Sequence, residues 1–251
     1  MCIRDSTHQD VDADLPFMGC ATMDVGLIRA RVARISVCGE LGYEINCSAA
    51  EHITLRDILL EAGAGQDIKE FGFYAMNALR LEKSFGIWSA EFTQDRTPGM
   101  TGVDRWIDWS RDDFIGHEAA AKEQSDGNVR QRLVTLEIDA DDADASGYEP
   151  IWQNDKRVGF VTSGGYGHHT SKSLAMGLLD TDVDERNGAL MVDVVGKRRG
   201  AITLTEPAWE RNDADWQKVK KKEQDSQMDG YGAYQEMSRY SPDGRFVTWF
   251  D

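Results

Sequence analysis

The sequence has few of the residue types that build metal centres. Its 251 residues include four cysteines and five histidines. No two cysteines have the spacing of a metal clip or a CxxC redox pair, and no two histidines have HExxH spacing. The adjacent His168 and His169 would point to opposite faces of a strand. A bound metal is therefore not expected. Free thiols favour a reducing compartment, the cytoplasm or, in a eukaryote, the mitochondrial matrix.

Long apolar runs and an excess of basic residues are also missing. No stretch is long and apolar enough to span a bilayer, and residues 1–14 lack the apolar core of a signal peptide. Lys and Arg total 28 against 44 Asp and Glu, which gives a formal net charge of −16. A surface of this sign repels nucleic acid and anionic membranes. Neither is expected as a partner.

Glu44 is a carboxylate at the end of an apolar, strand-like segment. Residues 33–38 lead into the run 39–45, in which Gly39 and Gly42 permit tight turns or close approach by a ligand. A buried carboxylate is costly unless hydrogen-bond donors surround it. Two interpretations remain open from the residues alone: Glu44 binds a ligand, or it faces water in a hairpin turn.

Arg80 places a positive charge inside another apolar segment. Residues 71–83 are apolar on nearly every face, which predicts a buried helix. Arginine keeps its charge in a protein, so Arg80 requires an anion. That anion is a ligand or a protein carboxylate, for which Glu44, Glu82 and Glu91 are candidates.

The first half of the chain carries the signals of short strands and a helix. Alternating apolar positions predict two strands between residues 25 and 45. Ser48 and Glu51 have the spacing of a capping box, so a helix is expected to follow and to end at Gly63.

Weaker signals continue toward the middle of the chain. A loop is expected over residues 93–102. Asp112 or Asp113 is expected to cap a helix over residues 114–121. Residues 124–128 have the composition of a linker.

The pattern then changes to short strands at regular spacing. Strands are expected over residues 131–138, 157–163, 173–179, 189–195 and 201–205. The last two form a hairpin across Gly196 and Lys197. This spacing predicts a small barrel or sandwich. The expected organisation is a start of cloning origin over residues 1–14, an α+β domain over 15–127, a β-barrel domain over 128–207 and a tail over 208–251.

Several other features have two interpretations. Residues 163–167 resemble a phosphate loop but lack its lysine and helix, so a tight turn is favoured. The aspartates of residues 139–144 lack the EF-hand pattern, so a solvated loop is favoured over a calcium site. Trp88 either stacks on a ligand or fills the core, with core filling favoured. Tyr43 and Tyr74 either line a pocket or are ordinary buried tyrosines.

Taken in order, these motifs resemble the folate-binding family of the glycine cleavage T-protein, whose domain also forms the C-terminal half of dimethylglycine and sarcosine dehydrogenases. The resemblance covers roughly residues 15–207. Its motifs are residues 39–45, 77–83, 88–91, 97–98, 114–116, 158–164 and 206–207. Residues 163–168 and 172–175 look more like the dehydrogenase branch.

The resemblance implies a fold and a site. The fold would be α+β, with a ferredoxin-like folate-binding piece followed by a C-terminal antiparallel β-barrel. Glu44 matches the glutamate that binds the pterin ring of tetrahydrofolate, and Arg80 matches the helix arginine near the folate. Tyr43 and Trp88 are the further cofactor-binding candidates. The family's catalytic aspartate would lie upstream of this chain, so the catalytic residues here are unknown.

The implied activity is tetrahydrofolate-dependent one-carbon transfer from a small methylamine, with FAD only in an upstream flavin domain or partner subunit. Three alternatives stay open: a free-standing aminomethyltransferase, a folate-dependent demethylase of sulfonium or methyl ether compounds, and a non-catalytic folate-binding subunit. The last draws on departures from the family pattern at Val37 and Met100 and on the first third of the family's domain, which this chain is expected to lack. Cys38 and His117 also depart from the pattern.

Overall fold

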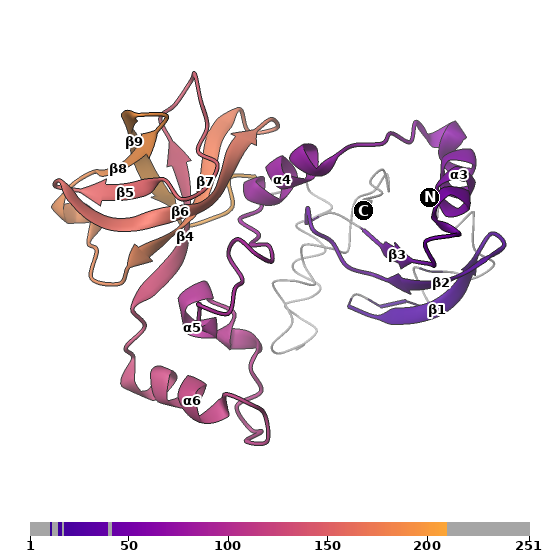
Figure 1. Cartoon of the computed structure of the whole chain (residues 1–251), viewed down its shortest axis with the longest axis horizontal. Coiled ribbons are helices and arrows are strands. Elements are labelled where there is room, and N and C mark those ends of the chain that lie inside the picture. The colour runs from indigo at the N-terminus through magenta and orange to yellow at the C-terminus, as the bar shows by residue number, and fades with distance from the viewer. Residues whose placement is uncertain (1–10, 12–14, 17, 40–41, 210–251) are drawn as a thin grey trace, which may run out of the picture. The chain divides into compact units, whose positions relative to one another are not determined.

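The computed structural model describes residues 11, 15–16, 18–39 and 42–209, which form two compact units (Figure 1). The first unit runs up to Met76, and the second begins at Asn77. The expectations for residues 1–10 and for the tail from residue 210 lie outside the described residues. Domain boundaries at residues 127 and 207 stay predictions, because a compact unit and a domain need not coincide.

The first unit is a three-stranded antiparallel sheet with a helix packed on it. The strands are β1 (Cys20–Val25), β2 (Ile28–Ala33) and β3 (Glu44–Asn46), in the order β1-β2-β3. Every second residue of β2 is buried, so the sheet has one apolar face. Leu55 and Leu59 of α3 (His52–Gly63) pack against that face with no exposed surface.

The sequence placed the strand before Glu44 wrongly. The strand ends at Ala33, and residues 34–39 and 42–43 lie in a loop conformation. Gly39 has φ +75°, and a Cβ at Gly42 would lie 2.8 Å from the Ile35 carbonyl oxygen. The loop therefore folds back on itself where a strand would extend, and glycine permits this close approach.

The helix α3 exists and ends at Gly63 as expected, but its N-terminal cap differs from the prediction. Ser48 donates a 2.6 Å hydrogen bond to the Glu51 carboxylate, and the N-cap makes no side-chain bond to the helix. The chain also continues past Gly63 into a 3-10 turn, η1 (Ala64–Gln66). A left-handed residue, Asp67 with φ 52°, then ends the helical segment.

Helix α4 (Phe73–Glu82) is buried only in its later turns. Phe73 and Tyr74 are 60% and 90% exposed, whereas Arg80 and Leu81 have no exposed surface. Burial on every face, and a buried Tyr74, were therefore wrong predictions. Apolar composition alone does not tell which turn of a helix reaches a core.

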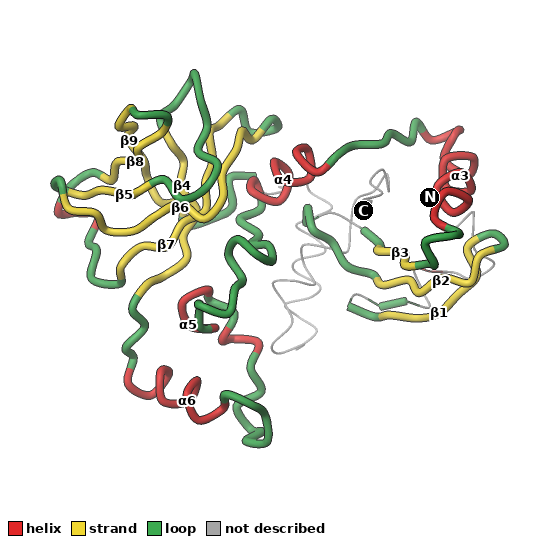
Figure 2. Tube along the Cα trace, in the orientation of Figure 1, coloured by secondary structure: helices red, strands yellow, loops and turns green. Residues whose placement is uncertain are grey.

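Two short helical elements and one longer helix connect α4 to the barrel (Figure 2). Within the expected loop, α5 (Pro98–Thr101) forms one helical turn, capped by the Thr97 hydroxyl. The turn η2 (Asp104–Trp106) follows. Helix α6 (His117–Asp126) begins after Gly116, with φ 91°, rather than at an aspartate, and occupies part of the expected linker. Asp113 pairs with Arg111 instead of capping the helix.

The second unit is built around a closed antiparallel barrel with the strand order β4-β7-β6-β5-β8-β9. The strands are β4 (Gln131–Ile138), β5 (Pro150–Gln153), β6 (Lys156–Gly167), β7 (Lys172–Asp180), β8 (Leu190–Val194) and β9 (Lys197–Leu204), with η3 (Glu185–Asn187) before β8. Leu136, Ile151 and Val192 are fully buried in its core. The expected α+β fold with a C-terminal antiparallel barrel is confirmed.

Three details of the barrel differ from the prediction. β5 was not expected. The hairpin turn is Val195-Gly196, both with positive φ, one residue earlier than predicted. Residues 163–167 are the end of β6 rather than a turn, and β6 needs glycine there because a Cβ at Gly164 would lie 2.8 Å from the Ala145 carbonyl carbon.

Gly164→Ala should destabilise the protein by about 1–3 kcal/mol, the range for overpacking a tight core. The clash is with backbone, which cannot rotate away as a side chain would. The matched control is Gly165→Ala in the same strand, where a Cβ would meet no atom closer than 3.5 Å. Chemical unfolding of both full-length variants tests this. Equal losses would show that the contact with Ala145 is not the cause.

Candidate functional site

Arg80 is bound inside the second unit by Glu91. The Arg80 Nη1 lies 3.3 Å from the Glu91 Oε2, and neither side chain has exposed surface. Arg80 also donates to the Phe85 carbonyl at 2.9 Å and to the Asn77 Oδ1 from Nε and Nη2 at 3.0 and 2.7 Å. Of the three candidate carboxylates, Glu91 is therefore the partner. Burial lowers the pKa of the Arg80 guanidinium, and the charge of Glu91 offsets part of this effect.

Glu91 receives hydrogen bonds from three separate segments. Its Oε1 accepts from the Thr162 hydroxyl at 2.5 Å and the Ser163 hydroxyl at 2.6 Å, both on β6. Its Oε2 accepts from the Ile87 N–H at 2.9 Å and from Arg80. A buried carboxylate with donors to both oxygens has the partners that its burial requires. Glu91 thus joins α4, the following loop and the barrel.

Glu82 has a different task. Its Oε1 accepts bonds from the N–H groups of His169 and Thr170, both at 2.8 Å, and from the Thr170 hydroxyl at 3.1 Å. The Glu82 carbonyl accepts from the Trp209 N–H at 3.0 Å. Glu82 therefore holds the turn between β6 and β7 to the end of α4, and it is not the anion that Arg80 needs.

Trp88 projects from the loop that Glu91 anchors. This Trp88 loop comprises residues 84–92. Trp88 is 81% exposed and makes an edge contact with Phe92 at a ring distance of 6.3 Å. Core filling by Trp88 was therefore a wrong prediction. The loop folds so that Glu91 enters the interior while Trp88 stays outside; a role for Trp88 in ligand binding stays a prediction.

Glu44 and Tyr43 lie together in the first unit. Tyr43 is 8% exposed and belongs to the core of that unit, with the Arg34 guanidinium 6.0 Å from its ring centre. Glu44 pairs with Ala33 at the start of the edge strand β3 and is half-buried. A hairpin turn at Glu44 is thus excluded. Within the described ranges, no side-chain hydrogen bond or ion pair engages the Glu44 carboxylate.

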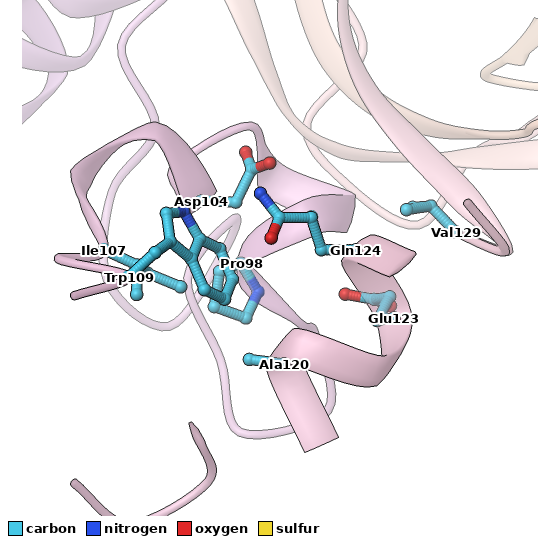
Figure 3. A pocket seen from close by; sticks show the side chains of 9 residues that line it. Pro98, Asp104, Ile107, Trp109, Ala120, Glu123, Gln124 and Val129 are labelled. Carbon is cyan, nitrogen blue, oxygen red and sulfur yellow. The ribbon is translucent and has the colours of Figure 1, made fainter. Parts of the chain in front are cut away.

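Two hollows lined by described residues of the second unit contain none of the predicted site residues. One is a cavity of about 30 Å³, where Pro98 and Trp109 face Ala120, Glu123 and Gln124 of α6 (Figure 3). That volume holds about one or two water molecules. A broader hollow of about 570 Å³ lies at the start of α6 and has His117 in its lining.

The acidic loop over residues 139–144 is solvated, as expected. Asp142 pairs with Lys197 at 2.8 Å and also with Arg199. The hydrogen bond from Lys197, followed by the charges of Arg199 and Lys197, lowers the pKa of Asp142. In the described part of the chain, no three acidic, histidine or cysteine side chains are grouped to hold a metal. The helices described there include none long and apolar enough to cross a membrane.

Fold and motifs together define a class: a mixed helix and strand protein with a closed C-terminal barrel. Two family models match the chain, the GCVT N-terminal domain over residues 2–111 and the glycine cleavage T-protein C-terminal barrel domain over residues 131–209. Together they cover about three quarters of the sequence. The chain belongs to the glycine cleavage T-protein family.

Similar proteins fall into two groups. Human mitochondrial dimethylglycine dehydrogenase is 36% identical over 203 residues, which is 80% of this chain and 23% of that protein. The aminomethyltransferase of Geobacillus sp. (strain WCH70) is 28% identical over 206 residues, 82% of this chain and 56% of that protein. The chain thus spans about a quarter of the first relative and about half of the second.

A solved structure shares the fold. The glycine cleavage system aminomethyltransferase T from Bartonella henselae superposes with a TM-score of 0.68 at 22% sequence identity. The match covers 80% of this chain and 54% of that one.

Arg80→Met should lower the free energy of unfolding by about 3–5 kcal/mol, because it leaves the buried Glu91 without its cation. The control is Arg132→Met, which removes a pair with Glu185 whose side chains are 41% and 35% exposed. Water screens that pair, so a much smaller loss is expected. Chemical unfolding of the full chain measures both. Losses of similar size would contradict a special role for the buried pair.

Proposed function

We propose that the chain binds tetrahydrofolate and serves one-carbon transfer from a small methylamine, as the folate half of an enzyme like dimethylglycine or sarcosine dehydrogenase. The observation that carries the proposal is the Glu44 carboxylate: half-buried, on an edge strand, and bonded to no described side chain. A pterin presents an aminopyrimidine edge with parallel N–H donors. A carboxylate is the natural bidentate partner of such an edge.

Each of the predicted cofactor-binding residues has a role that its chemistry supports within its own unit. Glu44 fixes the orientation of the pterin, and Tyr43 shapes the wall beside it. Trp88 offers an exposed aromatic face, and Arg80 holds the loop that carries Trp88. Tetrahydrofolate supplies the nitrogen atoms that accept the carbon. The protein contributes position, which by itself can account for much of a rate enhancement.

The dehydrogenase branch is the better supported of the two. Identity to human dimethylglycine dehydrogenase is 36%, against 28% to the Geobacillus aminomethyltransferase over a similar length. In this proposal FAD belongs to a separate flavin domain or subunit, and the family's catalytic aspartate lies in a preceding segment. The proposed location is the cytoplasm or, in a eukaryote, the mitochondrial matrix.

A free-standing aminomethyltransferase is the second candidate, since the Bartonella structure shares the fold. Product analysis with candidate donors separates the possibilities. Methylenetetrahydrofolate formed from dimethylglycine or sarcosine, with a flavin partner present, supports the first candidate. The methylene form produced from an aminomethylated carrier protein supports the second. Formation of 5-methyltetrahydrofolate would instead indicate a demethylase, and binding without turnover a non-catalytic subunit.

Glu44→Gln should weaken tetrahydrofolate binding about tenfold or more, because a hydrogen bond to a charged group contributes about 1.5–3 kcal/mol. Calorimetric titration of the full chain measures the affinity. Glu61→Gln, on the exposed side of α3, removes the same charge from the same unit and should leave the affinity unchanged. Unchanged binding by the Glu44 variant would remove the central claim.

A further inference from the structure

The Trp88 loop begins with a conformation that few side chains adopt. Ser84 and Ser89 have φ of 58° and 65°, in the left-handed region that disfavours residues other than glycine. A Cβ at Gly86 would lie 2.8 Å from the Phe92 ring and 2.9 Å from the Glu91 Cβ. Backbone strain of this kind persists only where surrounding contacts hold the loop in that conformation.

Glu91 provides those contacts from inside the loop. The Glu91 Oε2 accepts the Ile87 N–H, directly before Trp88, and the Glu91 N–H donates to the Ile87 carbonyl at 3.1 Å. From outside the loop, Arg80 reaches the Phe85 carbonyl and the same Glu91 oxygen. Ile87, directly before Trp88, is therefore tied to the buried carboxylate of Glu91, three residues after Trp88.

The barrel fixes that carboxylate in turn. Thr162 and Ser163 of β6 donate to the other oxygen of Glu91, and the Thr162 hydroxyl also lies 3.1 Å from the Met176 carbonyl of β7. Asn77, which accepts from Arg80, donates to the Gly164 carbonyl at 3.3 Å. Hydrogen bonds to Thr162, Ser163 and Gly164, three consecutive residues of β6, therefore fix the position of the Trp88 loop.

We infer that Glu91 is a positioning residue for the ligand site: it holds the exposed Trp88 at a fixed place on the barrel unit by joining Ile87, Arg80 and β6. The ligand that Trp88 meets rests on the proposed function, whereas the positioning itself does not. Glu91 is fully buried, so it acts through Trp88.

Glu91→Gln is the informative substitution because it keeps the size of the side chain. Glutamine has one accepting oxygen, which Thr162 and Ser163 can still use. Its amide NH₂ then faces the donors of Ile87 and Arg80 and cannot accept from them. The substitution therefore removes the hydrogen bonds from Ile87 and Arg80 and keeps those from Thr162 and Ser163 of β6.

Glu82→Gln is the matched control. Glu82, the last residue of α4, is also a buried glutamate and is 3% exposed. All three hydrogen bonds to its side chain go to one oxygen. A glutamine oxygen can keep all three. It has no bond to the Trp88 loop, so Trp88 should not sense this change.

The first measurement is fluorine NMR of the full chain labelled with 5-fluorotryptophan, with the Trp88 signal identified by its loss in Trp88→Phe. Glu91→Gln should shift or broaden the Trp88 signal, while Glu82→Gln leaves it in place. Thermal unfolding confirms that each variant is folded. An unchanged Trp88 signal in folded Glu91→Gln overturns the inference. Because no ligand is present, this outcome is independent of the proposed function.

The second measurement is tetrahydrofolate affinity in a double-mutant cycle. Trp88→Ala should weaken binding about tenfold, as expected for loss of a stacking face. Glu91→Gln should weaken it by a similar factor, and the double variant should bind no worse than Trp88→Ala alone. Additive losses would show that Glu91 does not act through Trp88. Absence of binding by the unaltered chain would refute the proposed function and leave the NMR result to decide the positioning.

Discussion

The buried pair of Arg80 and Glu91 is the interaction on which the second unit depends. A charge without exposed surface is expensive, and neither side chain would be tolerated without the other. The structure meets the cost with hydrogen bonds to both oxygens of Glu91 from a helix, a loop and a strand. Because Thr162 of β6 lies 71 residues from Glu91 in sequence, the pair fixes long-range packing as well as charge. The loop that carries Trp88 owes its place to the same pair.

The barrel was the most predictable part of the fold. Alternating positions such as Leu190, Val192 and Val194 report a strand through local sequence alone, and all three are buried. β5 was missed because four residues beginning with proline give little periodicity, and only its neighbours β6 and β8 make it a strand. The end of β6 was missed for the opposite reason. Its glycines resemble a turn, yet one of them, Gly164, permits close packing against Ala145.

The sequence predicted which kinds of residue the site needs, but not which of them contact one another. Residue chemistry alone shows that Arg80 needs an anion. The choice among Glu44, Glu82 and Glu91 depends on how the chain returns on itself, which local pattern does not contain. Trp88 illustrates the same limit. A large aromatic side chain favours burial, but Trp88 is exposed because the loop places the Glu91 side chain in the interior instead. Local sequence thus identifies the participants, and tertiary contacts decide their partners.

Closure of the barrel also determines how copies of the chain can associate. Each of the six strands has a neighbour on both sides, so none of them is a free edge strand. Addition of another chain to a free edge strand is therefore closed to the barrel. Among the described strands, β1 and β3 alone lie at the edges of an open sheet, and β3 is only three residues long. An assembly of this protein must use side-chain surfaces wherever it involves the barrel.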